Sequence, residues 1–567
     1  MSACRLRRIS PLSTLVVVSS FALVASCGSS TGTGPVGGGS AGTLGVGASA
    51  PVIPGAAISI DGGTSGGEYV LVVADTLTSG SGAASSFQVS ATGISAAGSV
   101  SLPSTSRVPS LTRGSGASLT RVDYGTLLNL AARPRLQALV ATARQTHIAA
   151  SRGISRSLSA SVPAVGDLIN YNVSQSDCDN IVIHPTRVVA VGSKAIVAVD
   201  TLNPPGGFVA TDYARIAANF DTLVYPLDVT NFGAPSDIDA NGHVVLLFTR
   251  AVNELTPAGS QSFIGGFFFS RDLFPQTTNT AFQGCPGSNV GEMFYLLAPD
   301  PTGAVNGHVR TKGFVDSLTN GTVAHEFQHL INSSRRLYVN NVPEAASDED
   351  VWLNEGLSHV AEELLFYRQG NLAPRINLDA PTIRASAAAV NAFNMDQAQN
   401  AGRYSDYLKA PALNSPFRED DSLSTRGATW DFLRYAADRK VRVAGSTEVS
   451  VWQALVNSST IGMANLRAVF GADMGAMFRD WAVSLYADDL VAADANFAQP
   501  SWNWRSVYPA LGGAYPLATN SLTLSGASSS IIPGGSAFYR FAIPANGTGS
   551  LTLTSGGAAS GVVLRIR

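Results

Sequence analysis

Short apolar runs separated by glycine and serine mark both ends of the chain. Between residues 56 and 94 these runs are "AAISID", "EYVLVVAD" and "SSFQVSATG", and after residue 516 they are "SLTLSG", "AFYRFAIP" and "SLTLTSG". Short runs of aliphatic and aromatic residues between turn-forming residues are typical of β-strands. We therefore predict one small β-sandwich at residues 51–110 and a second at residues 511–567.

The pattern changes to a helical period after the first of these regions. Residues 124–160 are rich in Ala, Leu and Arg, with apolar residues at helical spacing that Pro134 interrupts. This predicts a helical linker or pro-segment at residues 111–161.

The central block, residues 162–510, begins with strand-like runs and continues with helices. The strand-like runs are "NIVIHPTRVVAVGSKAIVAVD", "GHVVLLFT" and "GEMFYLLAPD", and helical spacing follows in "VAHEFQHLIN", "DVWLNEGLSHVAEELLFY" and "TRGATWDFLRYAADRK". Because a β-rich stretch precedes a helical one, we predict an α+β domain with a β-rich lobe followed by a helical lobe.

The composition narrows the class of protein. The chain has 567 residues, of which 45% are hydrophobic and 14% charged, so it is long enough for several globular domains and is not of a disordered type. A formal net charge of −3 provides no basic surface for nucleic acid, and no nucleic-acid partner is predicted. The sequence carries no signal for an oligomeric state.

The first residues resemble a bacterial lipoprotein signal. Arg5, Arg7 and Arg8 precede a short apolar core, and "LVASCG" places Cys27 where a cleavage site falls. This predicts a signal peptide at residues 1–26, lipidation of Cys27 and a flexible Gly/Ser-rich tether at residues 27–50. The alternative is a plain secretory signal with an incidental Cys27. In both cases the chain is exported, as a cell-envelope lipoprotein or a secreted protein, and it meets a membrane through a lipid anchor only, because no later run has the ~20 apolar residues of a spanning helix.

Export decides how the cysteines are interpreted. Cys4 leaves with the signal peptide and Cys27 is acylated, so Cys178 and Cys285 remain as one pair in an oxidising compartment. We predict a disulfide between them; two buried free thiols are the alternative.

The motif "VAHEFQHLIN", residues 323–332, carries the candidate chemistry. On a helix His325 and His329 lie on one face and can bind a common metal ion, while Glu326 can take a proton from a water beside that metal. The alternative is an ordinary amphipathic helix.

A catalytic zinc ion needs a third protein ligand and an open fourth position. "WLNEGLSHVAEEL" offers Glu355 for this role, with His359 and Glu362 following at i+4 and i+7. The alternative for this segment is an amphipathic helix with solvated acids.

"HEFQH" followed by "WLNEGLSHVAEE" resembles the gluzincin metallopeptidases and looks most like the hyicolysin family, over roughly residues 165–490. The resemblance implies a thermolysin-like domain with one catalytic Zn²⁺ on His325, His329 and Glu355, and with Glu326 as general base and acid. Together with the export signal and a strand that can hold an extended peptide, these ligands predict an exported endopeptidase that hydrolyses peptide bonds of a protein or peptide substrate with a metal-activated water. The alternatives are an aminopeptidase, with Glu292 binding a free amine, and a non-catalytic surface binding or adhesion lipoprotein on the same fold.

The sequence departs from the relatives in its supporting residues. Thermolysin-like relatives place an aspartate four residues after the third ligand, where this chain has His359, so Glu362 becomes the candidate to orient a zinc histidine, beside His359 and Asn354. "GRYSDY" supplies Tyr404 and Tyr407 as candidates for stabilising the oxyanion, and no spacing rule favours one of them.

Two further expectations concern substrate and calcium. "GEMFYLLAPD", just ahead of the zinc motif, is the predicted edge strand that holds an extended peptide through backbone hydrogen bonds. In "SDIDANGHVVLLF", Asp237, Asp239 and Asn241 resemble half of a Ca²⁺ loop, but Phe248 stands where the bidentate Glu belongs. A turn at Asn241 and Gly242 leading into a strand is the favoured interpretation, and calcium is a weaker one.

Overall fold

A computed structural model describes residues 39–98, 120–151, 161–276 and 283–567 of the chain. All of these belong to one compact unit, Gly38–Arg567. The predicted signal peptide, Cys27 and the first half of the predicted tether, residues 27–38, lie outside the described residues. Within the described part of the chain, no helix combines the length and the apolar composition that crossing a membrane requires.

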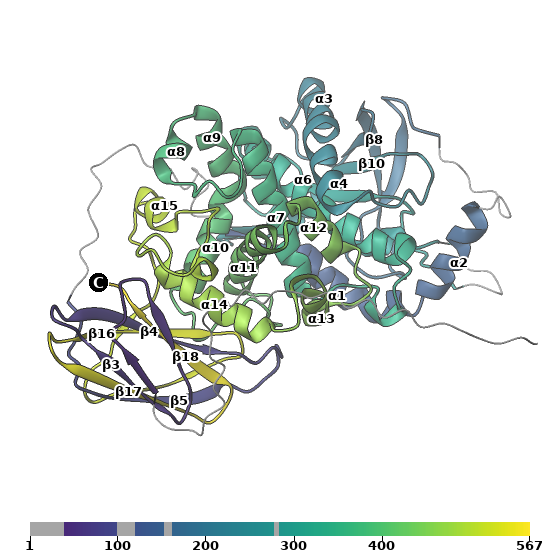
Figure 1. Cartoon of the computed structure of the whole chain (residues 1–567). Coiled ribbons are helices and arrows are strands. Elements are labelled where there is room, and N and C mark those ends of the chain that lie inside the picture. The colour runs from purple at the N-terminus through teal and green to yellow at the C-terminus, as the bar shows by residue number, and fades with distance from the viewer. Residues whose placement is uncertain (1–38, 99–119, 152–160, 277–282) are drawn as a thin grey trace, which may run out of the picture. The chain divides into compact units, whose positions relative to one another are not determined.

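One β-sandwich contains strands from both ends of the chain (Figure 1). One sheet has the strand order β1-β3-β17-β5-β15 and the other the order β14-β16-β4-β18-β2. The strands are β1 Gly39–Gly42, β2 Ser49–Val52, β3 Ala57–Asp61, β4 Gly67–Asp75, β5 Ser85–Thr92, β14 Asn520–Ser521, β15 Ala527–Ile531, β16 Ser536–Ile543, β17 Thr548–Ser555 and β18 Ala559–Arg565.

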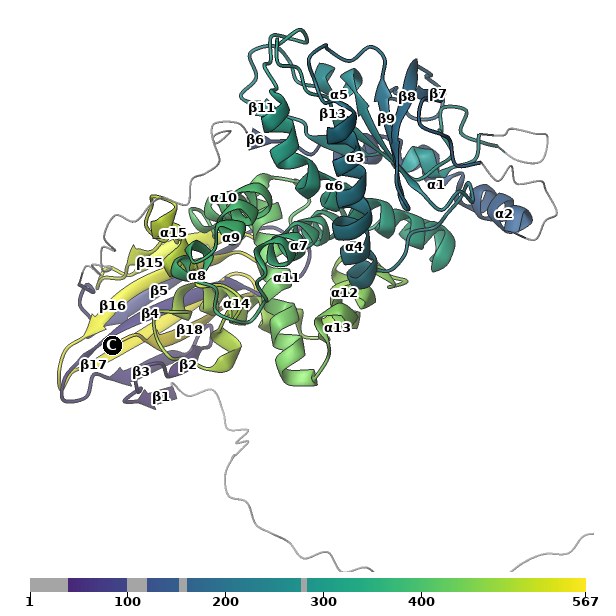
Figure 2. The ribbon, with the colours of Figure 1, turned by 90° about the horizontal axis from the view of Figure 1, so that it is seen from above.

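The prediction of two separate sandwiches is therefore wrong. β4 pairs with β16 on one side and with β18 on the other, so its two neighbours both come from the C-terminal end. β5 lies between β17 and β15 in the same way. In Figure 2 the purple and yellow strands alternate accordingly. The alternating apolar pattern identifies strands but carries no information about which strands pair, and each end alone leaves its central strands without neighbours.

A second, six-stranded sheet has the order β12-β13-β10-β9-β8-β7. β10 and β13 are buried along their whole length, and β10 runs parallel to both β9 and β13. The strands are β7 Leu168–Asn172, β8 Ile183–Val191, β9 Ala195–Asp200, β10 Val244–Thr249, β12 Gly266–Phe268 and β13 Met293–Leu297.

The predicted edge strand is not at the edge. "GEMFYLLAPD" forms β13, which lies between β10 and the short antiparallel strand β12. Its five consecutive buried residues are typical of an internal strand, because both of its faces are covered. The edge nearest the zinc motif is instead β12.

Helices lie both between the strands of the central block and after them, so the described chain is a mixed α and β protein that fits the α+β class. The helices are α1 Tyr124–Gln137, α2 Val140–Ser151, α3 Ala210–Asn219, α4 Tyr225–Phe232, α5 Arg250–Glu254, α6 Lys312–Ser334, α7 Val351–Gly370, α8 Ala380–Arg384, α9 Ala387–Ala392, α10 Ala398–Leu408, α11 Leu423–Ala444, α12 Glu448–Val456, α13 Gly462–Phe470, α14 Met474–Ala487 and α15 Trp504–Ala510.

The interruption expected at Pro134 lies further along the chain. α1 continues through Pro134 to Gln137, and the next helix begins at Val140. Leu128, Ala132 and Leu136 form one buried face of α1 on both sides of the proline, and this packing keeps the helix continuous where the proline removes one backbone hydrogen bond.

The predicted disulfide is confirmed. Cys178 and Cys285 are bonded, with their Cα atoms 4.6 Å apart. The bond ties the loop after β7 to the loop ahead of β13.

Candidate metal centre

Helix α6 places the two motif histidines together. It begins at the N-cap Thr311, whose side chain accepts a hydrogen bond from Phe314 N, and it runs without a break past the motif. His325 and His329 are buried one turn apart, and their Nε2 atoms lie 3.2 Å from each other. Both imidazoles therefore present a nitrogen to the same point.

Glu355 reaches this point from α7. Its Oε2 lies 3.5 Å from His325 Nε2, and its Oε1 lies 3.6 Å from His329 Nε2. A tetrahedral zinc ion with ligands at ~2.0–2.2 Å separates its ligand atoms by ~3.3–3.6 Å. The three side chains have the donor types and the spacing of a catalytic zinc site, so they fit this ion.

The charges around His325 favour a bound cation. Burial alone would lower the pKa of His325, but three neighbouring carboxylates raise it to about 10, those of Asp123, Glu355 and Glu362. Burial lowers the pKa of His329 to about 4, so this ring is neutral and offers a lone pair at neutral pH. Burial would raise the pKa of Glu355, but the neighbouring Arg426 and the two histidines hold it well below its usual range.

The other ring nitrogens of the two histidines also have partners. His325 Nδ1 lies 3.1 Å from Glu362 Oε1, and the other oxygen of Glu362 lies 3.1 Å from His359 Nδ1. His329 Nδ1 lies 3.0 Å from the hydroxyl of Ser358, which sequence reasoning missed although it stands one turn after Glu355 on α7.

Asn354 lies beside this group, and its side chain hydrogen-bonds His329. Its Oδ1 accepts a hydrogen bond of 2.9 Å from Asn332 Nδ2, and the residue lines a cavity of about 30 Å³ together with His329 and Glu355. Thr126 of α1 also lines this cavity. The space holds roughly two water molecules.

Glu326 connects the motif to the edge strand. Its Oε2 accepts a hydrogen bond of 2.9 Å from the backbone N–H of Phe268 in β12. Burial raises the pKa of Glu326 to about 7. A carboxyl group with such a pKa can both accept and return a proton near neutral pH.

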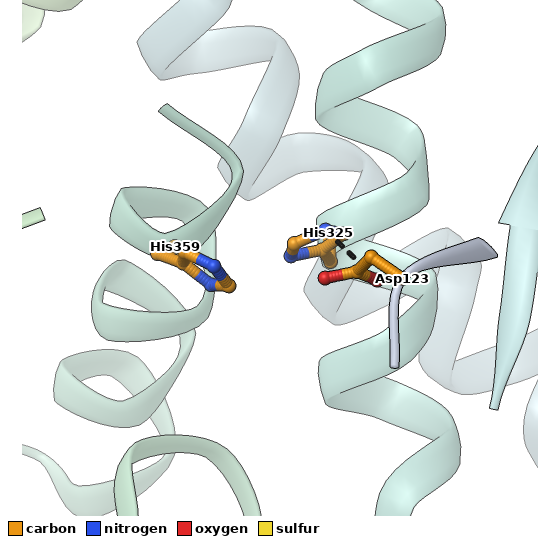
Figure 3. A group of neighbouring side chains, drawn as sticks. All are labelled: Asp123, His325 and His359. Carbon is orange, nitrogen blue, oxygen red and sulfur yellow. Dashed lines mark ion pairs between the residues drawn. The ribbon is translucent and has the colours of Figure 1, made fainter. Parts of the chain in front are cut away.

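Residues just ahead of α1 complete the group, and sequence reasoning missed them. Figure 3 shows Asp123 with its carboxylate directed at His325 on α6, across from His359 on α7. Asp123 Oδ1 lies 3.5 Å from His325 Nε2. Arg121 pairs with Glu362, and Arg426 of α11 pairs with Asp123 and, at 2.6 Å, with Glu355 Oε2. No local pattern signals these contacts, because they join remote segments.

The structure does not bring Tyr404 or Tyr407 to this group. Both side chains are fully buried in an aromatic cluster, where Tyr404 packs against Trp504 and Tyr407 stacks on Trp481. Apolar packing explains both rings, so the expectation of an oxyanion role receives no support from their positions.

Glu292 lies in a different cluster. It is 2% exposed and accepts hydrogen bonds from the Ser236 hydroxyl at 3.0 Å and from Ile238 N at 3.1 Å. Its carboxylate lies close to those of Asp237 and Asp239. It is buried and is not part of the histidine group.

The segment of Asp237 forms a turn. Asp237 Oδ1 accepts hydrogen bonds of 3.1 Å from the N–H groups of Asn241 and Gly242, and Gly242 adopts the left-handed conformation with φ 71°. β10 begins at Val244, and Phe248 is buried within it. The favoured interpretation of a turn leading into a strand is confirmed, while calcium binding stays a prediction.

The comparisons with known proteins agree with a metal-dependent peptidase. No protein-family model matches this chain. It is similar to the neutral metalloprotease ShpI of Staphylococcus hyicus, with 30% identity over 162 residues, which are 29% of this chain and 32% of that protein. The chain thus spans about a third of the length of the relative it matches. This partial similarity supports a metallopeptidase family.

Proposed function

We propose that the chain is an exported zinc-dependent endopeptidase of the gluzincin type. The observation that carries the proposal is the spacing of 3.2–3.6 Å among the donor atoms of His325, His329 and Glu355, supplied by two packed helices. The partial similarity to a protein named as a neutral metalloprotease supports the same class. The motifs resemble those of the hyicolysin family, and this finer assignment is part of the proposal.

The roles of the residues follow from their contacts. When bound, zinc supplies a Lewis acid that makes a water molecule more acidic and polarises the substrate carbonyl. Glu326 accepts the proton of the attacking water and returns it to the leaving amine. Glu362 holds the imidazole of His325 through Nδ1, so that Nε2 faces the metal. Ser358 lies 3.0 Å from Nδ1 and 3.2 Å from Nε2 of His329 and positions that ring beside the metal.

Cleavage within a peptide chain fits the edge strand. β12 bonds to β13 on one side, and its other edge lies next to Glu326, where an extended peptide can add a strand. An aminopeptidase needs a carboxylate for the free amine, and Glu292, the candidate from the sequence, is bonded to Ser236 and Ile238 instead. We therefore favour the endopeptidase over the aminopeptidase.

Two further parts of the proposal concern location and the rival function. The disulfide between Cys178 and Cys285 supports export, since such bonds persist in oxidising compartments. A lipid anchor at Cys27 stays a prediction. A non-catalytic binding lipoprotein on this fold would not need Glu326 beside two histidines and a third donor.

The test is the substitution Glu326→Gln in the full chain. We expect about one zinc per chain in both proteins, and loss of casein hydrolysis in the variant, because the amide cannot accept the proton of the water. Glu254→Gln, on an exposed ion pair of α5, is the matched control and should hydrolyse casein as the wild type does.

Casein hydrolysis is measured in two states of each protein, the intact chain and the chain after limited cleavage by trypsin. A serine-protease inhibitor stops the trypsin before casein is added. Equal turnover by Glu326→Gln and the wild type would refute the mechanism. Zinc-loaded wild type that cleaves nothing in either state would favour the binding protein.

A further inference from the structure

Residues 120–137, here called the cleft segment, comprise β6 (Thr120–Arg121) and α1 and lie against the candidate zinc centre. We propose that the cleft segment is an intramolecular inhibitor of this centre, and that Asp123 is the residue that blocks it. The inference rests on the proposed function, since it concerns the regulation of the same site.

Asp123 stands where a substrate or water would approach. Its Oδ1 lies 3.5 Å from His325 Nε2, the same distance at which Glu355 Oε2 lies from that nitrogen. The carboxylate of Asp123, which comes from the chain segment ahead of α1, therefore lies as close to the imidazole of His325 as the carboxylate of Glu355 does (Figure 3). Asp123 forms a compact donor group with His325 and His359, beside the group of His325, His329 and Glu355. Carboxylate oxygen is an ordinary zinc ligand, so Asp123 stands on the His325 side of the metal position and obstructs a substrate that approaches there.

The cleft segment also takes the backbone groups that a peptide would use. β6 pairs in parallel with β11 (Ser262–Phe263), and Val122 N donates to Phe263 O at 2.8 Å. Further along, Asn129 Nδ2 donates to the carbonyl of Phe268 in β12 at 3.0 Å. An extended substrate at this edge would need the same strand positions.

Polar contacts fasten the cleft segment to the catalytic residues themselves. Arg121 pairs with Glu362 and also lies 3.3 Å from His325 Nδ1, and Thr126 donates to Glu355. Asp123 pairs with Arg426, which also holds Glu355. The segment therefore contacts the proposed third zinc ligand and the carboxylate that orients His325, rather than a remote surface.

The position of the cleft segment in the chain separates it from a removable leader. Strands β1–β5 precede it, and β4 and β5 lie in the interior of the sandwich sheets. A single cut that discarded everything up to residue 137 would also remove these strands. Activation must therefore free the cleft segment while β1–β5 stay in place, by displacement or by cleavage that leaves the sandwich intact.

The experiment compares the zinc-loaded full chain with its Asp123→Ala variant. The probe is a fluorescent peptide hydroxamate, which binds accessible zinc, and its affinity is measured by anisotropy beside casein hydrolysis. If the open state is a tenth of the population or less, the variant should bind the probe about tenfold tighter or more and gain turnover in proportion.

Two variants make the result interpretable. Arg121→Ala removes a different anchor of the cleft segment and should change probe binding in the same direction. Asp316 lies on α6 and forms an exposed ion pair with Arg215 of α3. Asp316→Ala removes this ion pair and should leave probe binding unchanged.

Equal probe affinity in the wild type and both cleft-segment variants would overturn the inhibitor role and leave the proposed function standing, provided that zinc is bound and casein is cleaved. Absence of zinc and of probe binding in every protein would instead refute the proposed function and the inhibitor role together.

Discussion

His325 uses both of its ring nitrogens, and this one residue joins most of the site. Nε2 faces His329, Glu355 and Asp123, while Nδ1 faces Glu362. The pairing of His325 with His329 follows from helix geometry and could be predicted from the sequence. Asp123 could not, because its contact depends on where a remote segment folds.

Glu362 gives a first prediction at the residue scale. Glu362→Gln should weaken zinc binding by about 10–100-fold, because it disturbs the partner that orients His325. Glu355→Gln should weaken zinc binding more, because this substitution changes a proposed zinc ligand itself. Competition with a chromogenic chelator measures both, with Glu254→Gln as the unaffected control. A larger loss in Glu362→Gln than in Glu355→Gln would assign the third ligand to Glu362.

Glu292 gives a second prediction at the residue scale, which concerns the stability of the folded chain. Burial raises the pKa of Glu292 to about 8 from an ordinary value of 4.5. Between these pH values the folded chain holds a proton that the unfolded chain has released, so this carboxyl lowers stability as the pH rises through the window. Glu292→Gln keeps an acceptor oxygen for Ser236 and Ile238. It should raise Tm at pH 8 by ~2 °C or more, and by less at pH 5.

Calorimetry at the two pH values checks this prediction. An equal change in Tm at pH 5 and pH 8 would show that the carboxyl of Glu292 does not titrate in this window.

At the scale of elements, the periodic patterns identified β13, α6 and α7 but not their neighbours. Five consecutive apolar residues mark β13 as buried, and only the fold shows that the three-residue strand β12 covers its edge. So short a strand has too few residues for an alternation to be visible. The place where a peptide can add to the sheet was therefore misassigned.

Close packing of α10 and α11 gives the prediction at this scale. A Cβ on Gly427 of α11 would lie 2.3 Å from the backbone carbonyl carbon of Arg403 on α10, and backbone cannot move aside as a side chain can. Gly427→Ala should destabilise the protein by about 1–3 kcal/mol. Gly402→Ala on α10 meets no atom within 4 Å and should stabilise it by up to about 1 kcal/mol.

Denaturant unfolding measures both changes in the free energy of unfolding. If both variants were stabilised, α10 and α11 would not approach as closely as described.

At the scale of the whole chain, the sandwich joins residues 39–98 to residues 520–567. Each end was recognisable as β from its own pattern, whereas the pairing of the two ends was not, because it links positions more than 400 residues apart, such as Val72 and Phe538. Pairing between strands so far apart in the sequence is a non-local contact, which a local pattern does not reveal.

Because both ends of the chain form one sandwich, the structure predicts what happens when the N-terminal strands are removed. A chain that begins at residue 99 lacks β4 and β5, so β16, β17 and β18 lose central neighbours and expose apolar residues such as Phe541 and Leu553. We expect it to bind a hydrophobic dye and to aggregate, whereas a chain that begins at residue 39 should remain monodisperse. Size-exclusion chromatography with dye fluorescence compares the two. A monodisperse, dye-free product from the shorter chain would contradict the shared sandwich.

The central claim is that His325, His329 and Glu355 bind one zinc ion. A crystal structure of the zinc-loaded full chain, with anomalous difference maps on both sides of the zinc absorption edge, tests it most directly. We predict one strong peak at ~2.0–2.2 Å from the Nε2 atoms of both histidines and from a carboxylate oxygen of Glu355. A map with no peak there, or with its zinc peak among Asp237, Asp239 and Glu292, would contradict the account.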